Sequence, residues 1–135
     1  MKYILTLIGI VSLGMVGQEG TLSVKINGLS NVKGQLMIAI YDSSCNFPKH
    51  DAAFKQLKIN AKASNFSVTL PVKRKYAIAV YHDQNLNQKM DKNFFGVPVE
   101  KYGFSNQARG IFGPPSFDEA AFYFSKSTVV SIWLE

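Results

Sequence analysis

Oxygen-bearing side chains recur at alternate positions in one segment of this chain. Asp83, Asn85, Asn87 and Asp91 stand at positions one, three, five and nine of a loop. With this spacing a tightly turning backbone wraps a hard cation such as calcium, and Lys89 at position seven would offer its backbone carbonyl. The pattern therefore predicts a metal site, with calcium as the ion, formed by these five residues.

Two positions depart from the EF-hand pattern, and they exclude a true EF-hand. Position six, which needs glycine for its sharp turn, is Gln88, and position twelve, which needs a bidentate glutamate, is Phe94. The loop has two carboxylates with lysines close by, so we expect weak binding, on the order of 10⁻⁴–10⁻³ M. Glu100 would complete the shell from outside the loop. The alternative is a plain turn, in which Asp and Asn accept hydrogen bonds from their own backbone.

His82 lies directly before this loop, at the end of an apolar run. An imidazole there can ligate a metal or act as an acid or base, because its ordinary pKa lies near neutrality. A hydrolase would pair His82 with Asp83, Asp91 or Glu100. The sequence contains no serine nucleophile elbow, HExxH helix, phosphate-binding glycine loop or paired-cysteine zinc site. A structural histidine at a strand end is the other interpretation.

The loop continues into a segment rich in glycine, proline and aromatic residues that runs to Phe117. Glycine permits positive φ and proline fixes φ, so together they indicate a rigid path. We expect most of the aromatic side chains to pack over an open end of the fold; they are Phe94, Phe95, Tyr102, Phe104, Phe112 and Phe117. In the functional interpretation the segment lines a binding surface for a sugar, a peptide or an envelope component. That surface would comprise His82, Glu100, Tyr102, Phe104, Asn106 and Arg109.

Alternation of apolar and polar residues predicts strands over nearly all of the remaining chain. The predicted strands cover 21–27, 36–41, 54–59, 66–70, 76–81, 117–124 and 130–134. The third has irregular spacing that suggests a bulge, and residues 118–121 could instead form a helical turn. Seven strands without an amphipathic helix predict an all-β fold, a seven-stranded immunoglobulin- or prealbumin-like β-sandwich with one long ordered loop.

The first 17 residues differ in character from the rest. Met1 and Lys2 precede an apolar run from Ile4 to Val16, and Gly17 is a small residue suited to cleavage. This is typical of a secretory signal peptide, and the run is shorter than the roughly 20 residues that span a bilayer. We therefore expect a signal peptide at 1–17, a single domain at 18–135, and a periplasmic or secreted protein with no membrane span after cleavage.

The charge composition limits the classes of partner that the protein is expected to bind. The chain has 15 Lys and Arg against 9 Asp and Glu, a formal charge of +6, and its only basic cluster is residues 73–75. No basic stripe with interleaved aromatic residues is present, so nucleic acid is excluded as a partner, whereas weak attraction to anionic envelope surfaces is expected. The one cysteine, Cys45, cannot form an intramolecular disulfide, and we expect it to be a half-buried loop residue.

A long ordered string of residues resembles a known bacterial family. It comprises His82-Asp83-x-Asn85-x-Asn87-x-Lys89-x-Asp91, Asn93-Phe94-x-Gly96-x-Pro98-x-Glu100-x-Tyr102-Gly103-Phe104-Ser105-Asn106, Ala108-Arg109-Gly110 and Phe112-Gly113-Pro114-Pro115-Ser116-Phe117-x-x-Ala120. The string resembles the family called domain of unknown function 2141. The resemblance implies an exported single-domain sandwich and no assigned activity, so it transfers no catalytic residue. Similar members often have glycine where this chain has Leu86 or Gln88.

Together these observations predict an exported, non-catalytic binding or envelope-associated module of unknown ligand, with a weak calcium site in the 83–91 loop. Its partner would be an envelope component, a carbohydrate or a protein. A small hydrolase that uses His82 with a nearby carboxylate is the alternative, and a purely structural module is a third possibility.

Overall fold

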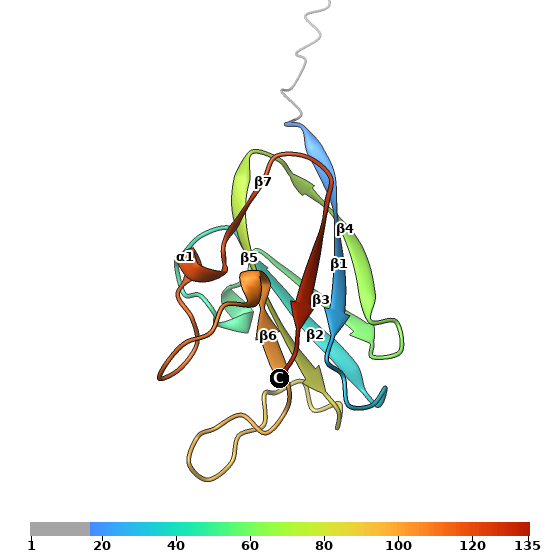
Figure 1. Cartoon of the computed structure of the whole chain (residues 1–135), viewed down its shortest axis with the longest axis vertical. Coiled ribbons are helices and arrows are strands. Elements are labelled where there is room, and N and C mark those ends of the chain that lie inside the picture. Colours follow the sequence, from blue (N-terminus) through green and yellow to red (C-terminus); the bar gives the residue numbers. More distant parts are fainter. Residues whose placement is uncertain (1–16) are drawn as a thin grey trace, which may run out of the picture.

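The computed structural model describes residues 17–135, so the predicted signal peptide lies almost entirely outside the described residues. The described part is all-β with almost no helix (Figure 1). Its strands are β1 (Glu19–Asn27), β2 (Gln35–Tyr41), β3 (Lys55–Asn60), β4 (Asn65–Pro71), β5 (Arg74–Asp83), β6 (Tyr102–Phe104), β7 (Phe122–Phe124) and β8 (Thr128–Trp133). Its short helical elements are the 3₁₀ helices η1 (His50–Ala52) and η2 (Ser105–Gln107) and the single α-helical turn α1 (Phe117–Ala120).

The strands form two sheets. The first has the order β4-β1-β8, in which β1 is antiparallel to β4 and parallel to β8. The second has the order β3-β2-β5-β6, all antiparallel, and β7 pairs with the beginning of β5. Backbone hydrogen bonds between Tyr102 and Glu135, 3.0 and 3.1 Å long, connect β6 with the chain end that follows β8. One side of the fold is therefore closed by hydrogen bonds between the sheets.

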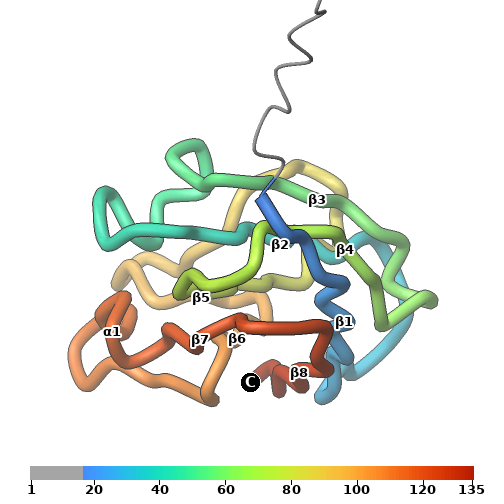
Figure 2. The backbone as a smooth tube through the Cα atoms, turned by 90° about the horizontal axis from the view of Figure 1, so that it is seen from above, coloured from blue at the N-terminus to red at the C-terminus, as the bar shows by residue number. Residues whose placement is uncertain are grey.

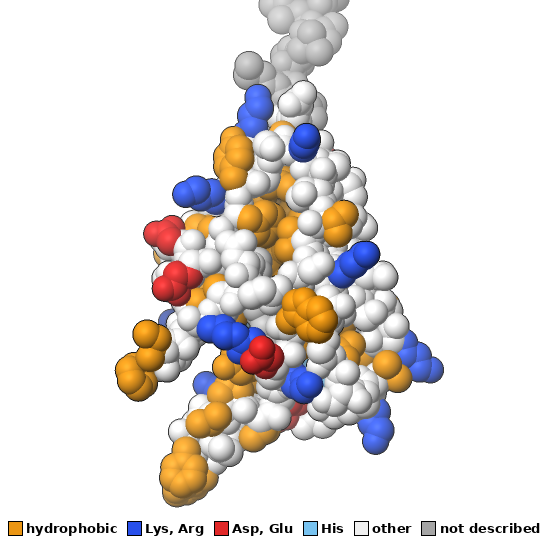
Figure 3. All heavy atoms as spheres, viewed as in Figure 1, with side chains coloured by type: hydrophobic (Ala, Val, Ile, Leu, Met, Phe, Trp, Pro, Cys, Tyr) orange, Lys and Arg blue, Asp and Glu red, His pale blue; other side chains and the backbone are white. Residues whose placement is uncertain are grey.

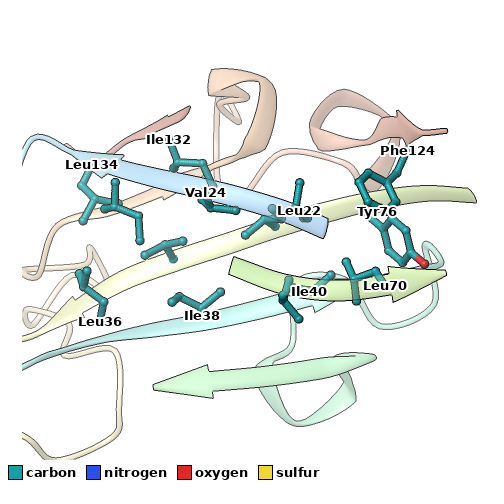
Figure 4. Packing of buried hydrophobic residues seen from close by; sticks show 14 of the residues in the cluster. Leu22, Val24, Leu36, Ile38, Ile40, Leu70, Tyr76, Phe124, Ile132 and Leu134 are labelled. Carbon is teal, nitrogen blue, oxygen red and sulfur yellow. The ribbon is translucent and has the colours of Figure 1, made fainter. Parts of the chain in front are cut away.

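The core lies between the two sheets. Leu22, Val24 and Ile26 alternate with polar residues in β1 and are buried, as the period of a strand requires. They pack in one cluster with buried side chains of both sheets (Figure 4), among them Leu36, Ile38, Ile40, Leu70, Tyr76, Phe124, Ile132 and Leu134. The Tyr76 hydroxyl donates to the Pro71 carbonyl at 2.6 Å, which satisfies the one polar group that this ring brings inside.

A second apolar cluster covers the outer face of the β2–β5 sheet. Ala39, Tyr41 and Ala77 point to this face, and Phe104, Phe117 and Ala120 pack on it. The chain after β2 and the chain around α1 supply the cover, and Figure 2 shows both lying beside β5. Strand β2 is therefore buried on both faces.

The structure corrects several predicted elements. It has eight strands rather than seven, because β6 lies inside the segment predicted as one long loop. Residues 117–120 form α1 rather than a strand, since Ser116 and Glu119 make a reciprocal capping box, and only β7 follows as strand. The bulge predicted for 54–59 is wrong: β3 pairs regularly with β2. Cys45 is exposed, not half-buried.

No helix among residues 17–135 has the length and apolar character needed to cross a membrane.

Gly34 makes the turn into β2 possible and gives the first testable prediction. Its φ is +71°, and a Cβ there would lie 2.2 Å from the Asp83 carbonyl oxygen, a backbone atom. We expect Gly34→Ala to lower the free energy of unfolding by about 3 kcal/mol, because both the left-handed backbone and the clash oppose it. Urea denaturation measures the loss.

Gly96→Ala is the matched control. Gly96 has φ +76°, but a Cβ there would meet no atom within 4 Å. It should cost about 1 kcal/mol, the price of the left-handed backbone alone. Equal losses of unfolding free energy in the two variants would show that Gly34 does not lie close to the backbone of Asp83.

Candidate functional site

Asp83 ends β5 and fixes the start of the long segment that follows. Its carboxylate is fully buried and accepts three hydrogen bonds. The donors are the backbone N–H groups of Asn87 (3.2 Å) and Gln88 (2.8 Å) and the side-chain amide of Gln35 (2.8 Å). A buried carboxylate is tolerated when donors surround it, so the chain must return to Asp83 immediately after leaving it.

The two asparagines of the loop use their oxygens on the backbone. The side-chain oxygen of Asn85 accepts from the N–H of Asn87 at 3.3 Å, and that of Asn87 accepts from the N–H of Lys89 at 3.0 Å. Their amide nitrogens both donate to Asp91, each at 2.8 Å. The five residues of the predicted metal site are thus brought together, in the arrangement of a turn held by its own hydrogen bonds.

Among residues 17–135 no group of three or more His, Cys, Asp or Glu side chains is placed so that it could hold a metal ion. A cation at this loop would have to displace the hydrogen bonds that Asn85 and Asn87 make. The calcium site stays a prediction, and the hydrogen bonds favour the alternative of a plain turn.

Glu100 and Asp91 form a carboxyl pair beside the loop. Glu100 is buried, and its Oε2 lies 3.5 Å from the backbone nitrogen of Asp91. Burial, followed by the hydrogen bond to the Asp91 side chain, raises the pKa of Glu100 from 4.5 to about 7. The side-chain amides of Asn87 and then Asn85 lower the pKa of Asp91. The proton of the pair is therefore held on Glu100.

His82 is buried and faces the core between the sheets. Its Nε2 lies 2.5 Å from the backbone carbonyl oxygen of Lys33, and its Nδ1 has no hydrogen-bond partner among the described residues. Strand alternation places the carboxylate of Asp83 on the opposite face of β5. The histidine is thus not presented to a substrate, and its place is that of a structural histidine at a strand end.

The aromatic side chains of the long segment divide into two groups. Phe104 and Phe117 are buried and Tyr102 is half-buried. Phe94, Phe95 and Phe112 are almost wholly exposed, so the expectation that most aromatics pack over an open end of the fold is wrong. Tyr102 and Phe104 belong to β6 and lie against β5, and Phe117 packs on the same sheet face from α1. The three exposed rings lie at loop ends.

A pocket of about 530 Å³ opens over the outer face of the β2–β5–β6 sheet. Its floor contains Ala39 and Ala79, which are paired across β2 and β5. Aromatic rings stand around these small residues; they are Tyr41, Tyr81, Tyr102 and Phe104. The long segment and the chain after β2 complete the walls with Met90, Gly96, Pro98, Gly113, Pro114 and Pro48. Small residues encircled by rings leave the space that the pocket occupies.

The rim of the pocket is polar and basic. Gln88, Lys89, Lys92 and His50 line it, and none of the lining residues is a carboxylate. Burial lowers the pKa of His50, which leaves the imidazole neutral near pH 7, and its Nε2 has no hydrogen-bond partner within the described part of the chain. Burial, then the nearby charge of Asp83, raises the pKa of Tyr81 to about 12, so its hydroxyl stays protonated.

Two predicted ligand-binding residues have structural roles. The side-chain amide of Asn106 donates to the carbonyls of Ala121 (2.6 Å) and Glu119 (3.3 Å), which fastens η2 to α1. Arg109 pairs with Glu135 at 2.6 Å on the surface, beside a small cavity of about 90 Å³. Neither lines the large pocket.

Of the eleven predicted site residues, three line the pocket, namely Lys89, Tyr102 and Phe104. Sequence reasoning missed the residues that come from β2, η1 and β5; they are Ala39, Tyr41, His50, Ala79 and Tyr81. A signal for them exists, since Ala39-x-Tyr41 and Ala79-x-Tyr81 repeat one small-then-aromatic pattern on one face of each strand.

Comparison with known proteins identifies the family to which this chain belongs. Residues 24–131 match the family described as uncharacterized protein conserved in bacteria, DUF2141, which is most of the chain. The chain therefore belongs to this family, as the resemblance of its loop segment indicated. No curated protein and no solved structure matches it.

The Glu100 carboxyl predicts a pH dependence of stability. The folded protein keeps a proton on Glu100 that the unfolded chain has already released above pH 4.5. The stabilisation is thus fully present below about pH 4.5 and is lost as the pH rises through about 7. Glu100→Gln keeps a neutral group that can donate to Asp91. The variant should therefore not lose stability between pH 5 and pH 8, and at pH 8 its melting temperature should be higher than that of the wild type.

Thermal unfolding between pH 5 and pH 8 measures the effect, with Asp118→Asn, an exposed carboxyl of α1, as the control. The control should retain the pH dependence of the wild type. Parallel curves for Glu100→Gln and the wild type would contradict the assignment of the proton to Glu100.

Proposed function

We propose that the protein is a non-catalytic binding module whose pocket over β2, β5 and β6 takes a small ligand with an apolar or aromatic body and an acidic group. The single observation that carries the proposal is the pocket of about 530 Å³ with an apolar floor and a lysine rim. Small-molecule sites have volumes of roughly 300–1,000 Å³ and few polar groups.

The floor selects the body of the ligand. Ala39, Ala79 and Phe104 offer no polar side-chain atom, and the hydroxyl of Tyr41 already donates to the Pro48 carbonyl at 2.8 Å. A polar molecule would lose its hydration here without replacement hydrogen bonds, whereas a flat apolar body would bury against the rings. This favours an aromatic or aliphatic body over a free sugar.

The rim selects the acidic group. Lys89 and Lys92 border the opening, and the nearby carboxylates of Asp83 and Asp91 are engaged with loop donors. An anionic head beside two ammonium groups gains attraction without a facing negative charge at the rim. The Tyr81 hydroxyl supplies an uncharged hydrogen-bonding group near the same opening.

The rival interpretation, a hydrolase that uses His82, has less support. The imidazole is buried in the core and bonded to a backbone carbonyl, so it lacks access to a substrate. The further proposals are an immunoglobulin- or prealbumin-like sandwich and export to the periplasm or the outside. They rest on the two facing sheets and on the predicted signal peptide, respectively.

Filling the pocket floor tests the proposal. Anilinonaphthalene sulfonate, a fluorescent probe with an aromatic body and an acidic group, should bind the protein with enhanced emission. Ala79→Leu places three more carbons over the floor and should weaken probe binding about tenfold or more. Ala63→Leu, the same change at an exposed turn position, is the control and should leave the affinity unchanged. Equal affinity of Ala79→Leu and Ala63→Leu would refute the site.

The proposed preference for an acidic group is tested by comparing two probes, one with a sulfonate and one without. Phenylnaphthylamine has the same aromatic body without the sulfonate. Changing Lys89 and Lys92 to Gln should weaken sulfonate binding several-fold and leave binding of the uncharged amine unchanged. An equal effect on both probes would remove the acidic group from the proposal.

The predicted calcium site is tested by calorimetric titration of the protein without residues 1–17, together with Asp83→Ala and Asp91→Ala. The hydrogen bonds from Asn85 and Asn87 to Asp91 favour no heat and no rise of the melting temperature. Binding near millimolar calcium that both variants abolish would establish the ion as a ligand of the loop.

A further inference from the structure

Two loop ends of this protein carry large hydrophobic side chains that are almost fully exposed to solvent. The first, residues 93–99 between β5 and β6, exposes Phe94 (98%) and Phe95 (85%). The second, residues 110–114 between η2 and α1, exposes Ile111 (90%) and Phe112 (102%). We call these the first and second tips. Exposed apolar side chains scattered singly are ordinary, but four bulky ones at two neighbouring ends call for a partner.

Both tips border the pocket. Gly96 and Pro98 of the first tip line its wall, as do Gly113 and Pro114 of the second. In the view of Figure 1 the two loops project toward the lower left, and Figure 3 shows a notch between two projections whose ends are hydrophobic. The tips therefore flank one opening on one side of the molecule.

The first tip is held in shape by its own hydrogen bonds. The side-chain oxygen of Asn93 accepts from the N–H groups of Phe95 (2.9 Å) and Val97 (3.0 Å), and its backbone pairs with Val97 and Gly96. An antiparallel bridge between Lys92 and Pro98 closes the base. These bonds fix a turn that directs Phe94 and Phe95 outward.

The second tip is equally tight. A Cβ on Gly110 would lie 1.8 Å from the Gly113 carbonyl oxygen, so the loop closes on itself at a residue without a side chain. Ile111 and Phe112 lie within this closed turn, and their side chains are exposed. The exposure of the tips thus follows from local backbone structure.

The charge at the stem of the first tip is positive. The segment 84–102, which carries the first tip, contains three cationic side chains, Lys89, Lys92 and Lys101, and two acidic ones. Near the second tip Arg109 is paired with Glu135, and the exposed acids Asp118 and Glu119 follow in α1. Both acids of the segment 84–102, Asp91 and Glu100, are turned to each other and to the loop asparagines. Lys89 and Lys92 are exposed at the stem of the first tip. The first tip thus has exposed phenylalanines at its end and lysines at its stem. This arrangement is complementary to a surface with negatively charged groups on the outside and an apolar layer below them.

We propose that the two tips insert into the surface of an anionic lipid bilayer. Convex, separated tips suit a deformable apolar medium, which surrounds each ring from all sides, whereas a protein interface needs a continuous complementary patch. Phenylalanine gains apolar burial at the level of the headgroups, and each lysine near an anionic leaflet adds attraction. This inference stands without the pocket; only its corollary, that the pocket opens toward the bilayer and receives an amphiphile from it, rests on the proposed function.

Vesicle flotation tests the inference with the protein from residue 18 onward. Vesicles of phosphatidylcholine with about one third phosphatidylglycerol should carry the protein, and vesicles of phosphatidylcholine alone should carry much less. Changing Phe94 and Phe112 to Ser should weaken binding about tenfold or more, because both rings leave the interface. Raising the salt should weaken binding of the unmodified protein.

The control variant is Val129→Ser, which removes an exposed (62%) hydrophobic side chain from β8 and should bind vesicles normally. The Phe94 and Phe112 variant should keep its melting temperature and its affinity for anilinonaphthalene sulfonate, which separates the bilayer contact from the pocket. Absence of the protein from anionic vesicles, or unchanged flotation of the Phe94 and Phe112 variant, would overturn the inference. Flotation equal on both vesicle compositions would overturn the requirement for anionic lipid.

Discussion

The buried carboxylate of Asp83 is the constraint on which the rest of the structure depends. A charged group without access to water requires donors, and here the chain supplies them from Gln35 in the neighbouring strand and from its own next turn. Gly34 lies close to the same residue, where only a glycine leaves room. The 84–91 turn, and with it the pocket wall formed by Gln88, Lys89 and Met90, is thus tied to the end of β5. Leu86 and Gln88 adopt φ of 59° and 61° within this turn, a conformation that favours glycine, so the hydrogen bonds to Asp83 hold strained backbone in place.

The two faces of β5 divide the molecule into a stable part and an open part. Tyr76, Ile78 and Val80 point into the core between the sheets and pack with large neighbours. Ala77 and Ala79 point to the other face, where a small side chain leaves a hollow and the aromatic rings of β2, β5 and β6 surround it. A single strand period of two therefore produces both the core and the pocket. The same arrangement explains why His82 is structural although it stands next to Asp83, since neighbours in a strand face opposite ways.

Much of the fold could be predicted from alternation, whereas most of the site could not. The runs around β1, β2, β4, β5 and β8 carry a clear period, and the capping residues Ser116 and Glu119 bear out the helical turn that was the alternative for 118–121. Strand β6 has three residues inside a glycine- and proline-rich segment, too few to show a period. The spacing of Asn85 and Asn87 shows where side-chain oxygens occur in the sequence. It does not show that these oxygens already accept hydrogen bonds from backbone N–H groups of the loop and so are engaged. Alanine gives no chemical signal, so Ala39 and Ala79 are recognisable as a pocket floor only once the strands are paired.

The central claim is that Asp83 holds the long segment as an ordered wall of the pocket. The most direct test is ¹⁵N relaxation of the backbone amides, which reports order on the picosecond to nanosecond scale. The N–H groups of Asn87 and Gln88, which donate to Asp83, should have order parameters of about 0.85, equal to those of β5. Values below about 0.6 at these two amides would mean that the turn moves freely, and the account of a preformed pocket would be contradicted.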